Sequence, residues 1–353
     1  MRLHQAAAVL LTAASVVAGP STGLGAGAAA EKTLDFYFID VEGGQSTLIV
    51  TPAGQSLLVD TGYATDGRDA ARILAAARDA GVTQIDYLLL THFHQDHEGG
   101  IVELSRQLPI GTFFDHGSLA VDDPKAVADP GWARLLEPFN AYAAVRAKGR
   151  HVQPKPGEKL PLKGIDATWV ASARATIAKP VSGGGAPNPA CGPAAPPPGE
   201  PFENPRSTGF QLRFGKFRFV DLGDLSGEPL FTLLCPNNLL GAVDLYLVPH
   251  HGGADTTYPA TFAVQPRAAI VNNGPTKGGS PEGLAALNAV MAPDAVWQLH
   301  QSQLNGAVNF PGIQIANLDE TTGHWIKASA SEDGSFRVTN GRTGSARSYG
   351  PRR

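Results

Sequence analysis

Three histidines and one aspartate stand at positions 92–97, in the order His-x-His-x-Asp-His. The apolar run at residues 85–90 precedes them and is typical of a buried strand, and a glycine pair at 99–100 follows. The polar side chains are therefore expected on the turn at the carboxyl end of that strand, where alternate residues can converge on one ion and their neighbours on a second. Imidazole nitrogen and carboxylate oxygen are ligands that Zn²⁺, Mn²⁺ and iron accept from proteins. This spacing predicts a dinuclear metal site rather than an ordinary surface turn.

Other short runs of β-branched residues and leucine also end in a polar residue that can bind or orient a metal. The residues that stand just past such runs are Asp60, His92, Asp224 and His251. In a layered α/β protein the ends of neighbouring strands meet at one rim, and ligands bind there. Four separate strands are thus expected to bring their polar side chains to one place.

The chain resembles the metallo-β-lactamase superfamily over roughly residues 34–270. The segments that carry the resemblance are residues 36–50, 56–62, 92–100, 219–224 and 245–252. The Asp-Val-x-x-Gly-Gln-x element at 40–46 and the Val-Pro-His-His-Gly element at 248–252 are most similar to the hydrolase domain of ComEC-type DNA-uptake channels and its free-standing soluble relatives. The resemblance implies an α/β fold, a four-layer αββα sandwich with two sheets packed together and helices outside.

The resemblance also implies the ligands of two divalent ions, Zn²⁺ or Mn²⁺. The first ion would be held by His92 and His94, the second by Asp96, His97 and His251, and Asp224 would bridge the two. His250 remains the alternative to His251, and Asp96 would also orient the nucleophile. Asp60 is expected to accept an N–H from a ligand histidine and fix its orientation; a simple turn-forming Asp-x-Gly is the alternative.

One segment departs from the superfamily's pattern. Most members supply a third histidine to the first metal shortly before the Gly-Asp pair at 223–224, and residues 202–210 contain none. The uptake-channel relatives tend to carry Asn and Ser there, so Asn204, Ser207 or a water would take the place. A site with fewer nitrogen ligands shifts the preference from Zn²⁺ toward Mn²⁺.

His116 follows the aromatic run at 113–114 and is expected to face the same rim. There it would protonate a leaving group or contact substrate. The alternative is a capped loop histidine.

The first 30 residues have the pattern of a signal peptide. Arg2 gives a positive start, residues 6–18 are apolar but too short to span a bilayer, and small residues follow through position 30. The protein is therefore expected to be exported, to the periplasm or the extracellular space, without stable membrane insertion. The oligomeric state is left open.

Residues 31–345 are expected to form one hydrolase domain, because the donor residues are spread along the chain with no linker between them. A stretch rich in Gly, Pro, Ala and Ser at 181–201 predicts a surface loop inserted in that domain. Cys191 lies in this stretch, and in an exported chain a disulfide with Cys235 is expected. A free Cys235 in the core is the alternative.

The remaining pattern alternates between helices and strands, as the fold class requires. Helices are predicted at residues 69–80, 100–108 and 129–148, a strand pair at 210–214 and 217–220, and a closing hairpin at 325–328 and 335–338.

The expected chemistry is hydrolysis by a hydroxide generated at two metal ions. Redox chemistry is disfavoured, because the chain shows no flavin domain. The resemblance favours a phosphodiester substrate, either a small molecule or nucleic acid. However, 28 Lys and Arg stand against 32 Asp and Glu, and without Arg2 the balance is 27 against 32, or −5, which repels a polyanion unless a local patch overrides it.

Candidates for such a patch are Arg206, Arg213, Lys216 and Lys277. A lactone or β-lactam hydrolase is the alternative function. A protein that binds metal without turnover is the third.

Overall fold

Aromatic side chains from two sheets meet in one shared core. The ring of Phe36 lies 4.7 Å from that of Phe219 and 5.9 Å from that of Phe217, and all three side chains are fully buried. Apolar residues from both sheets continue this cluster on either side. The two sheets therefore pack face to face. The computed structural model describes residues 32–120, 124–192 and 202–352, so the predicted signal peptide at 1–30 lies outside the described residues.

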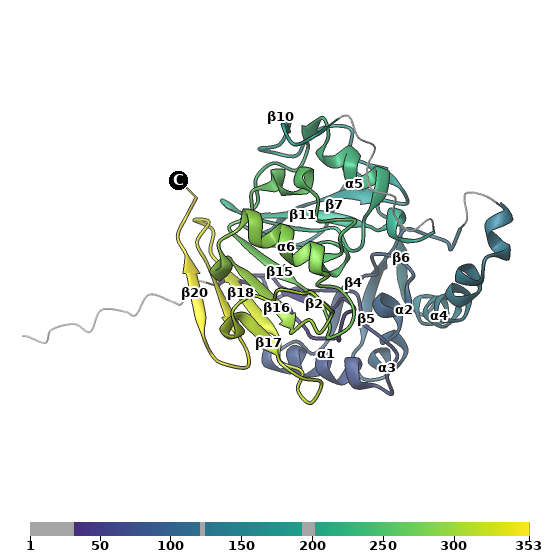
Figure 1. Cartoon of the computed structure of the whole chain (residues 1–353). Coiled ribbons are helices and arrows are strands. Elements are labelled where there is room, and N and C mark those ends of the chain that lie inside the picture. Colours follow the sequence, from purple (N-terminus) through teal and green to yellow (C-terminus); the bar gives the residue numbers. More distant parts are fainter. Residues whose placement is uncertain (1–31, 121–123, 193–201, 353) are drawn as a thin grey trace, which may run out of the picture. The chain divides into compact units, whose positions relative to one another are not determined.

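The first sheet combines antiparallel strands with a parallel half that runs from β3 to β6 (Figure 1). Its strands, in spatial order, are β20 (Ala346–Tyr349), β19 (Phe336–Asn340), β18 (Ile326–Ala330), β1 (Leu34–Phe38), β2 (Thr47–Val50), β3 (Ser56–Val59), β4 (Ile85–Leu89), β5 (Ile110–Phe114) and β6 (Arg150–Val152).

The second sheet has a parallel half that runs from β12 to β17. Its strands, in spatial order, are β17 (Ile315–Asn317), β16 (Val296–His300), β15 (Ala268–Val271), β14 (Leu245–Leu247), β12 (Phe217–Asp221), β11 (Gly209–Phe214), β8 (Asp166–Ser172) and β7 (Lys159–Leu160), with β9 (Ala175–Thr176) paired to β8.

Helices cover the outer face of each sheet, because their apolar stripes need burial. Residues of α1 (Arg68–Asp79), α3 (Ile101–Ser105) and α4 (Pro130–Arg146) pack on the first sheet. Residues of α5 (Gly227–Leu234) and α6 (Pro281–Val290) pack on the second. The predicted four-layer αββα architecture is confirmed.

The shorter helices lie in connections. They are α2 (Gln95–Glu98) and the 3₁₀ turns η1 (Pro124–Ala128), η2 (Asn204–Arg206), η3 (His250–Gly252), η4 (Pro259–Val264), η5 (Pro293–Ala295) and η6 (Gly312–Gln314). None of the helices in the described ranges is both long and apolar enough to cross a bilayer.

Two segments differ from the boundaries expected from the sequence. The first sheet continues through β20 beyond residue 345, because the ring of Tyr349 stacks on Phe336 at 4.4 Å. The described part of the 181–201 stretch is not a bare loop, because β10 (Ala186–Pro187) pairs with β13 (Asn237–Asn238). The side-chain amide of Asn188 donates to the backbone carbonyls of Leu234 and Ala260, each at 3.0 Å.

Cys191 and Cys235 form the predicted disulfide, which joins positions 44 residues apart. Because a crosslink of this span restricts the unfolded chain, we expect reduction to lower the free energy of unfolding by about 2–4 kcal/mol. Thermal unfolding with and without reductant measures this, and the doubly substituted chain C191S/C235S should unfold like the reduced protein. Equal unfolding temperatures in all three samples would contradict the expectation.

Candidate metal centre

The carboxyl ends of four strands bring polar side chains together at one rim. Asp60 follows β3, the His-x-His-x-Asp-His motif follows β4, Asp224 follows β12, and His251 follows β14. These strands belong to the parallel halves of the two sheets, so their carboxyl ends lie on the same side of each sheet. The two sheets thus contribute to one site.

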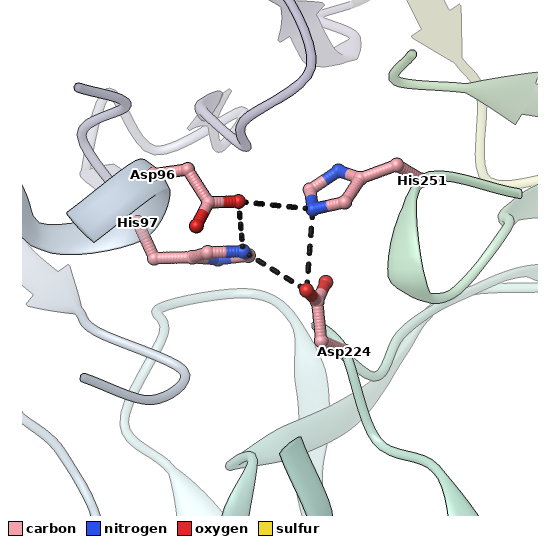
Figure 2. A group of neighbouring side chains, drawn as sticks. All are labelled: Asp96, His97, Asp224 and His251. Atoms are coloured by element: carbon pink, nitrogen blue, oxygen red, sulfur yellow. Dashed lines mark ion pairs between the residues drawn. The ribbon is translucent and has the colours of Figure 1, made fainter. Parts of the chain in front are cut away.

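One group of donors consists of Asp96, His97, Asp224 and His251, with one ligand atom from each lying within 4.8 Å of the others. Figure 2 shows the four side chains pointing toward one another. Oδ2 of Asp96 lies 3.2 Å from Nε2 of both His97 and His251. Oδ2 of Asp224 lies 3.2 Å from the same two nitrogens. Two carboxylates and two imidazoles therefore face a common point.

A second group consists of His92, His94 and Asp224. Nε2 of His92 lies 2.9 Å from Nδ1 of His94 and 3.8 Å from Oδ2 of Asp224. Asp224 is common to both groups, so its carboxylate lies where a bridging ligand must lie. These two groups correspond to the two ligand sets that the resemblance implied.

Some ring nitrogens of the first group lack hydrogen-bond partners among the described residues, and a divalent ion would supply one. Nε2 of His97 and both ring nitrogens of His251 are buried, yet they form no hydrogen bond with any residue in the described ranges. Buried nitrogens without hydrogen bonds are costly and call for a partner. An ion between these nitrogens and the two carboxylates would supply that partner for Nε2 of each histidine.

The electrostatics of the cluster also favour a cation. Burial alone lowers the pKa of His97, but Asp224, Asp96 and Asp60 outweigh it and raise that pKa well above its usual value. Burial raises the pKa of Asp224, but His251 and His97 hold it well below its usual value. Burial also raises the pKa of Asp96, but His97 and Lys277 hold it well below its usual value. The carboxylates of Asp96 and Asp224 are therefore ionised, and a divalent ion would displace the proton of His97. Burial and the neighbouring histidines lower the pKa of His92, which keeps it neutral and able to ligate.

Asp60 fixes the orientation of His97. Its Oδ2 lies 2.7 Å from Nδ1 of His97, and its two oxygens accept hydrogen bonds from the backbone N–H and the hydroxyl of Thr91, both at 2.8 Å. With Nδ1–H donating to Asp60, Nε2 faces the donor group. Asp60 thus lies where an orienting carboxylate is expected, and it is fully buried.

Unusual backbone angles shape the turns that carry these donors. Gly223 has a φ of +56°, and a Cβ at this position would lie 2.7 Å from Cβ of Thr91. Only glycine lets the turn before Asp224 approach the motif so closely. His250 and His251 also adopt the left-handed region, with φ of 50° and 54°, which is uncommon for residues with a side chain.

The structure separates the neighbouring His250 and His251. His251 belongs to the first donor group, whereas Nδ1 of His250 lies 2.9 Å from Oδ1 of Asp255. Nε2 of His250 lies 3.8 Å from Oδ2 of Asp224 and 3.3 Å from Nδ2 of Asn204. The side chain of His250 is 28% exposed, so its ring stands at the edge of the site.

Asn204 and Ser207, proposed for the place of the third histidine, lie in and just after η2. Both are buried, and the backbone N–H of Thr208 donates to the carbonyl of Thr91 at 2.8 Å. This bond places the segment beside the metal-binding motif. The hydroxyl of Ser207 has no hydrogen-bond partner within the described part of the chain.

His116, expected to face the same rim, lies in a buried contact beside the motif. Its side chain is buried, its ring packs on Phe93 at 4.2 Å, and its Nε2 lies 2.8 Å from Oε2 of Glu203. The same oxygen accepts the backbone N–H of Phe93, between His92 and His94, at 2.9 Å. The rule about strand ends locates a backbone but not the direction of a side chain. Glu203 was missed because nothing in the sequence links it to a motif 110 residues away.

The four basic residues proposed as a patch are not gathered at the site. Arg213 and Lys216 lie toward the hairpin that joins β11 to β12, whereas Asp224 follows the opposite end of β12. Arg213 pairs with Asp166 at 3.1 Å, and Arg206 is mostly buried. Lys277 does reach the site, where its ammonium contacts Oδ2 of Asp96.

Comparisons with known proteins agree with this fold. Residues 39–169 match the model of the Metallo-beta-lactamase superfamily. No curated protein matches the sequence. The matched segment includes the His-x-His-x-Asp-His motif.

The solved structures that resemble the chain are distant. The metallo-beta-lactamase fold protein YhfI from Bacillus subtilis is 11% identical, with 75% of this chain and 95% of that protein covered and a TM-score of 0.43. A metallo-beta-lactamase mutant from Cronobacter sakazakii is 15% identical, with 52% of this chain and 59% of that protein covered and a TM-score of 0.32. CmlA, a diiron beta-hydroxylase from Streptomyces venezuelae, is 14% identical, with 69% of this chain and 45% of that protein covered and a TM-score of 0.38. The chain thus spans less than two thirds of the latter two proteins, and likenesses this remote carry no argument about its substrate.

Proposed function

We propose that this chain is an exported hydrolase that depends on two divalent ions and acts on phosphodiesters. The observation that carries the proposal is the position of Asp224, whose carboxylate belongs to both groups of donors. When bound, two divalent ions lower the pKa of a water that they share and polarise an oxygen of the substrate. The disulfide supports export, because disulfides persist mainly in oxidising compartments.

The protein's own residues orient the reaction. Asp60 holds His97 in one orientation, and Asp96 lies between His97, His251 and Lys277, where its carboxylate can orient a nucleophile. Nδ1 of His250 is held by Asp255, and Nε2 lies beside Asn204 at the edge of the site, where the protonated ring can give a proton to a leaving group.

Two features favour a phosphodiester over a neutral ester. The ammonium of Lys277 lies beside the donor group and attracts an anionic substrate. The donor set is rich in carboxylate oxygen and lacks a third histidine in the segment that usually supplies it, which suits Mn²⁺ as well as Zn²⁺. The resemblance to the ComEC-type hydrolase domain agrees with this preference.

Activity of the reconstituted protein tests the proposal. Purified protein, stripped with chelator and reloaded with Mn²⁺ or Zn²⁺, is assayed on bis(4-nitrophenyl) phosphate, a lactone and a chromogenic β-lactam. We expect metal-dependent cleavage of the phosphodiester, faster with Mn²⁺, and the same rates for the control H324A, which alters a histidine outside both donor groups. Efficient cleavage of the lactone or the β-lactam with no cleavage of the phosphodiester would replace the proposal with the alternative function. If no substrate is cleaved while both ions bind, the protein binds metal without turnover on these classes.

A further inference from the structure

A cavity of about 400 Å³ opens directly beside the candidate metal centre. His94 and Asp96 line one side of it, so a molecule that fills the cavity lies next to residues of both donor groups. Phe202 and, from α4, Arg134 and Leu135 also line the cavity. Its volume is within the range of small-molecule pockets, which enclose one ligand rather than a polymer.

Part of the lining is apolar and aromatic. Leu135 is buried, and the half-buried ring of Phe202 lies 6.4 Å from the ring of Trp132. A Cβ at position 131 would lie 3.3 Å from the ring of Phe202, so Gly131 leaves room for that ring where a larger side chain would press on it. Gly131 and Leu135 are four residues apart on α4 and therefore share one helix face. This face and Phe202 offer a flat surface on which an aromatic group can stack.

The polar groups of the cavity favour an anion at its edge. Arg134 is exposed and lines the cavity, and its guanidinium is a planar donor suited to phosphate oxygens. Asp129 also lines the cavity, but its Oδ1 already accepts the backbone N–H of Gly131 at 2.7 Å as the cap of α4. Lys277 contacts Asp96, so the donor group has a cation close to it as well.

We propose that this cavity, named here the aryl pocket and lined by His94, Asp96, Arg134, Leu135 and Phe202, binds the non-reacting arm of a small phosphodiester, and that this arm is aromatic. The inference rests on the proposed function and adds the substrate class. The arm stacks on Phe202, Arg134 holds an oxygen of the phosphodiester, and the phosphorus lies toward the donors. The positions of Arg213 and Lys216 favour the same class. Both lie at the hairpin end of β11 and β12, away from Asp224, so they do not extend the positive charge at the site along a polyanion.

Two substrates with the same leaving group test the pocket. Bis(4-nitrophenyl) phosphate and methyl 4-nitrophenyl phosphate both release 4-nitrophenolate, but only the first has an aromatic non-reacting arm. In the metal-loaded protein we expect kcat/KM to be higher for the first. F202A should lower this value about tenfold for the aryl arm and little for the methyl arm, which corresponds to the upper range of an aromatic pair. F202Y should retain the preference, and L136A, a change at an exposed residue of the same helix outside the pocket, should leave both values unchanged.

Binding without turnover gives a readout that does not depend on the reaction. Diphenyl phosphate, whose phenoxide is a poor leaving group, is titrated against the metal-loaded protein and followed by tryptophan fluorescence, with dimethyl phosphate as the comparison. Saturable quenching by diphenyl phosphate, weakened by F202A and by R134Q and lost in W132F, supports the pocket even if no ester is cleaved. If diphenyl phosphate binds in this way but no ester is cleaved, the proposed function fails and the pocket stands. Equal kinetics for both esters in the wild type and in F202A, together with no quenching, would overturn the pocket while leaving hydrolysis in place.

Discussion

The substitution D224A is expected to remove most of the bound metal and most of the turnover. Asp224 is the only residue common to both donor groups found in the described ranges, so its loss should weaken the binding of both ions at once. Loss of an outer partner of a metal ligand already costs about 10- to 100-fold in affinity or activity. Loss of a shared ligand should cost more, on the order of 1000-fold in kcat/KM on the phosphodiester, measured together with metal content after gel filtration.

Two other variants separate this loss from general damage to the fold. H92A removes a donor of one group only, so it should retain an ion held by Asp96, His97 and His251. D333A alters an exposed aspartate in the C-terminal hairpin and should match the wild type in metal content and rate. Metal content in D224A equal to that of the wild type would show that this carboxylate is not a bridging ligand.

The sequence predicted the parts of the site that depend on local pattern. An apolar run followed by a polar turn defines a strand end, and parallel strands place such ends on one edge, so Asp60, Asp224 and the histidine motif could be assigned to one rim. The same reasoning did not predict the contact that His116 makes, because side-chain direction depends on what packs around the turn. In the structure that partner is Glu203, which lies far along the chain.

Long-range contacts account for the other differences. Residues 181–192 are biased in composition, yet β10 pairs with β13 and Asn188 donates to two backbone carbonyls of the core. The disulfide was predictable because only two cysteines are present. The pairing of β10 was not, because two-residue strands have no periodic signal. The aryl pocket likewise joins α4 to Phe202, two segments that are unrelated in sequence and adjacent only in the fold.

His250 and His251 are expected to respond differently when each is replaced by alanine. H251A should lose one of the two ions, because His251 belongs to the donor group that contains Asp96 and His97. H250A should keep both ions but slow turnover by about 100-fold or more on esters with poor leaving groups, because a general acid contributes about 10²- to 10⁴-fold.

Burial lowers the pKa of His250, but Asp224 and Asp255 outweigh it and raise that pKa to about 8. The protonated ring is the acid, so the rate should fall as pH rises through the pKa of His250, and this fall should be absent in H250A. In the metal-loaded protein that pKa lies below the metal-free value, because divalent ions on Asp224 offset the carboxylate that raises it. D255N should lower the pH at which the rate falls, because it removes a carboxylate that stabilises the protonated ring. Metal analysis and pH–rate profiles for the three variants measure these effects; loss of an ion in H250A with full metal content in H251A would exchange the two roles.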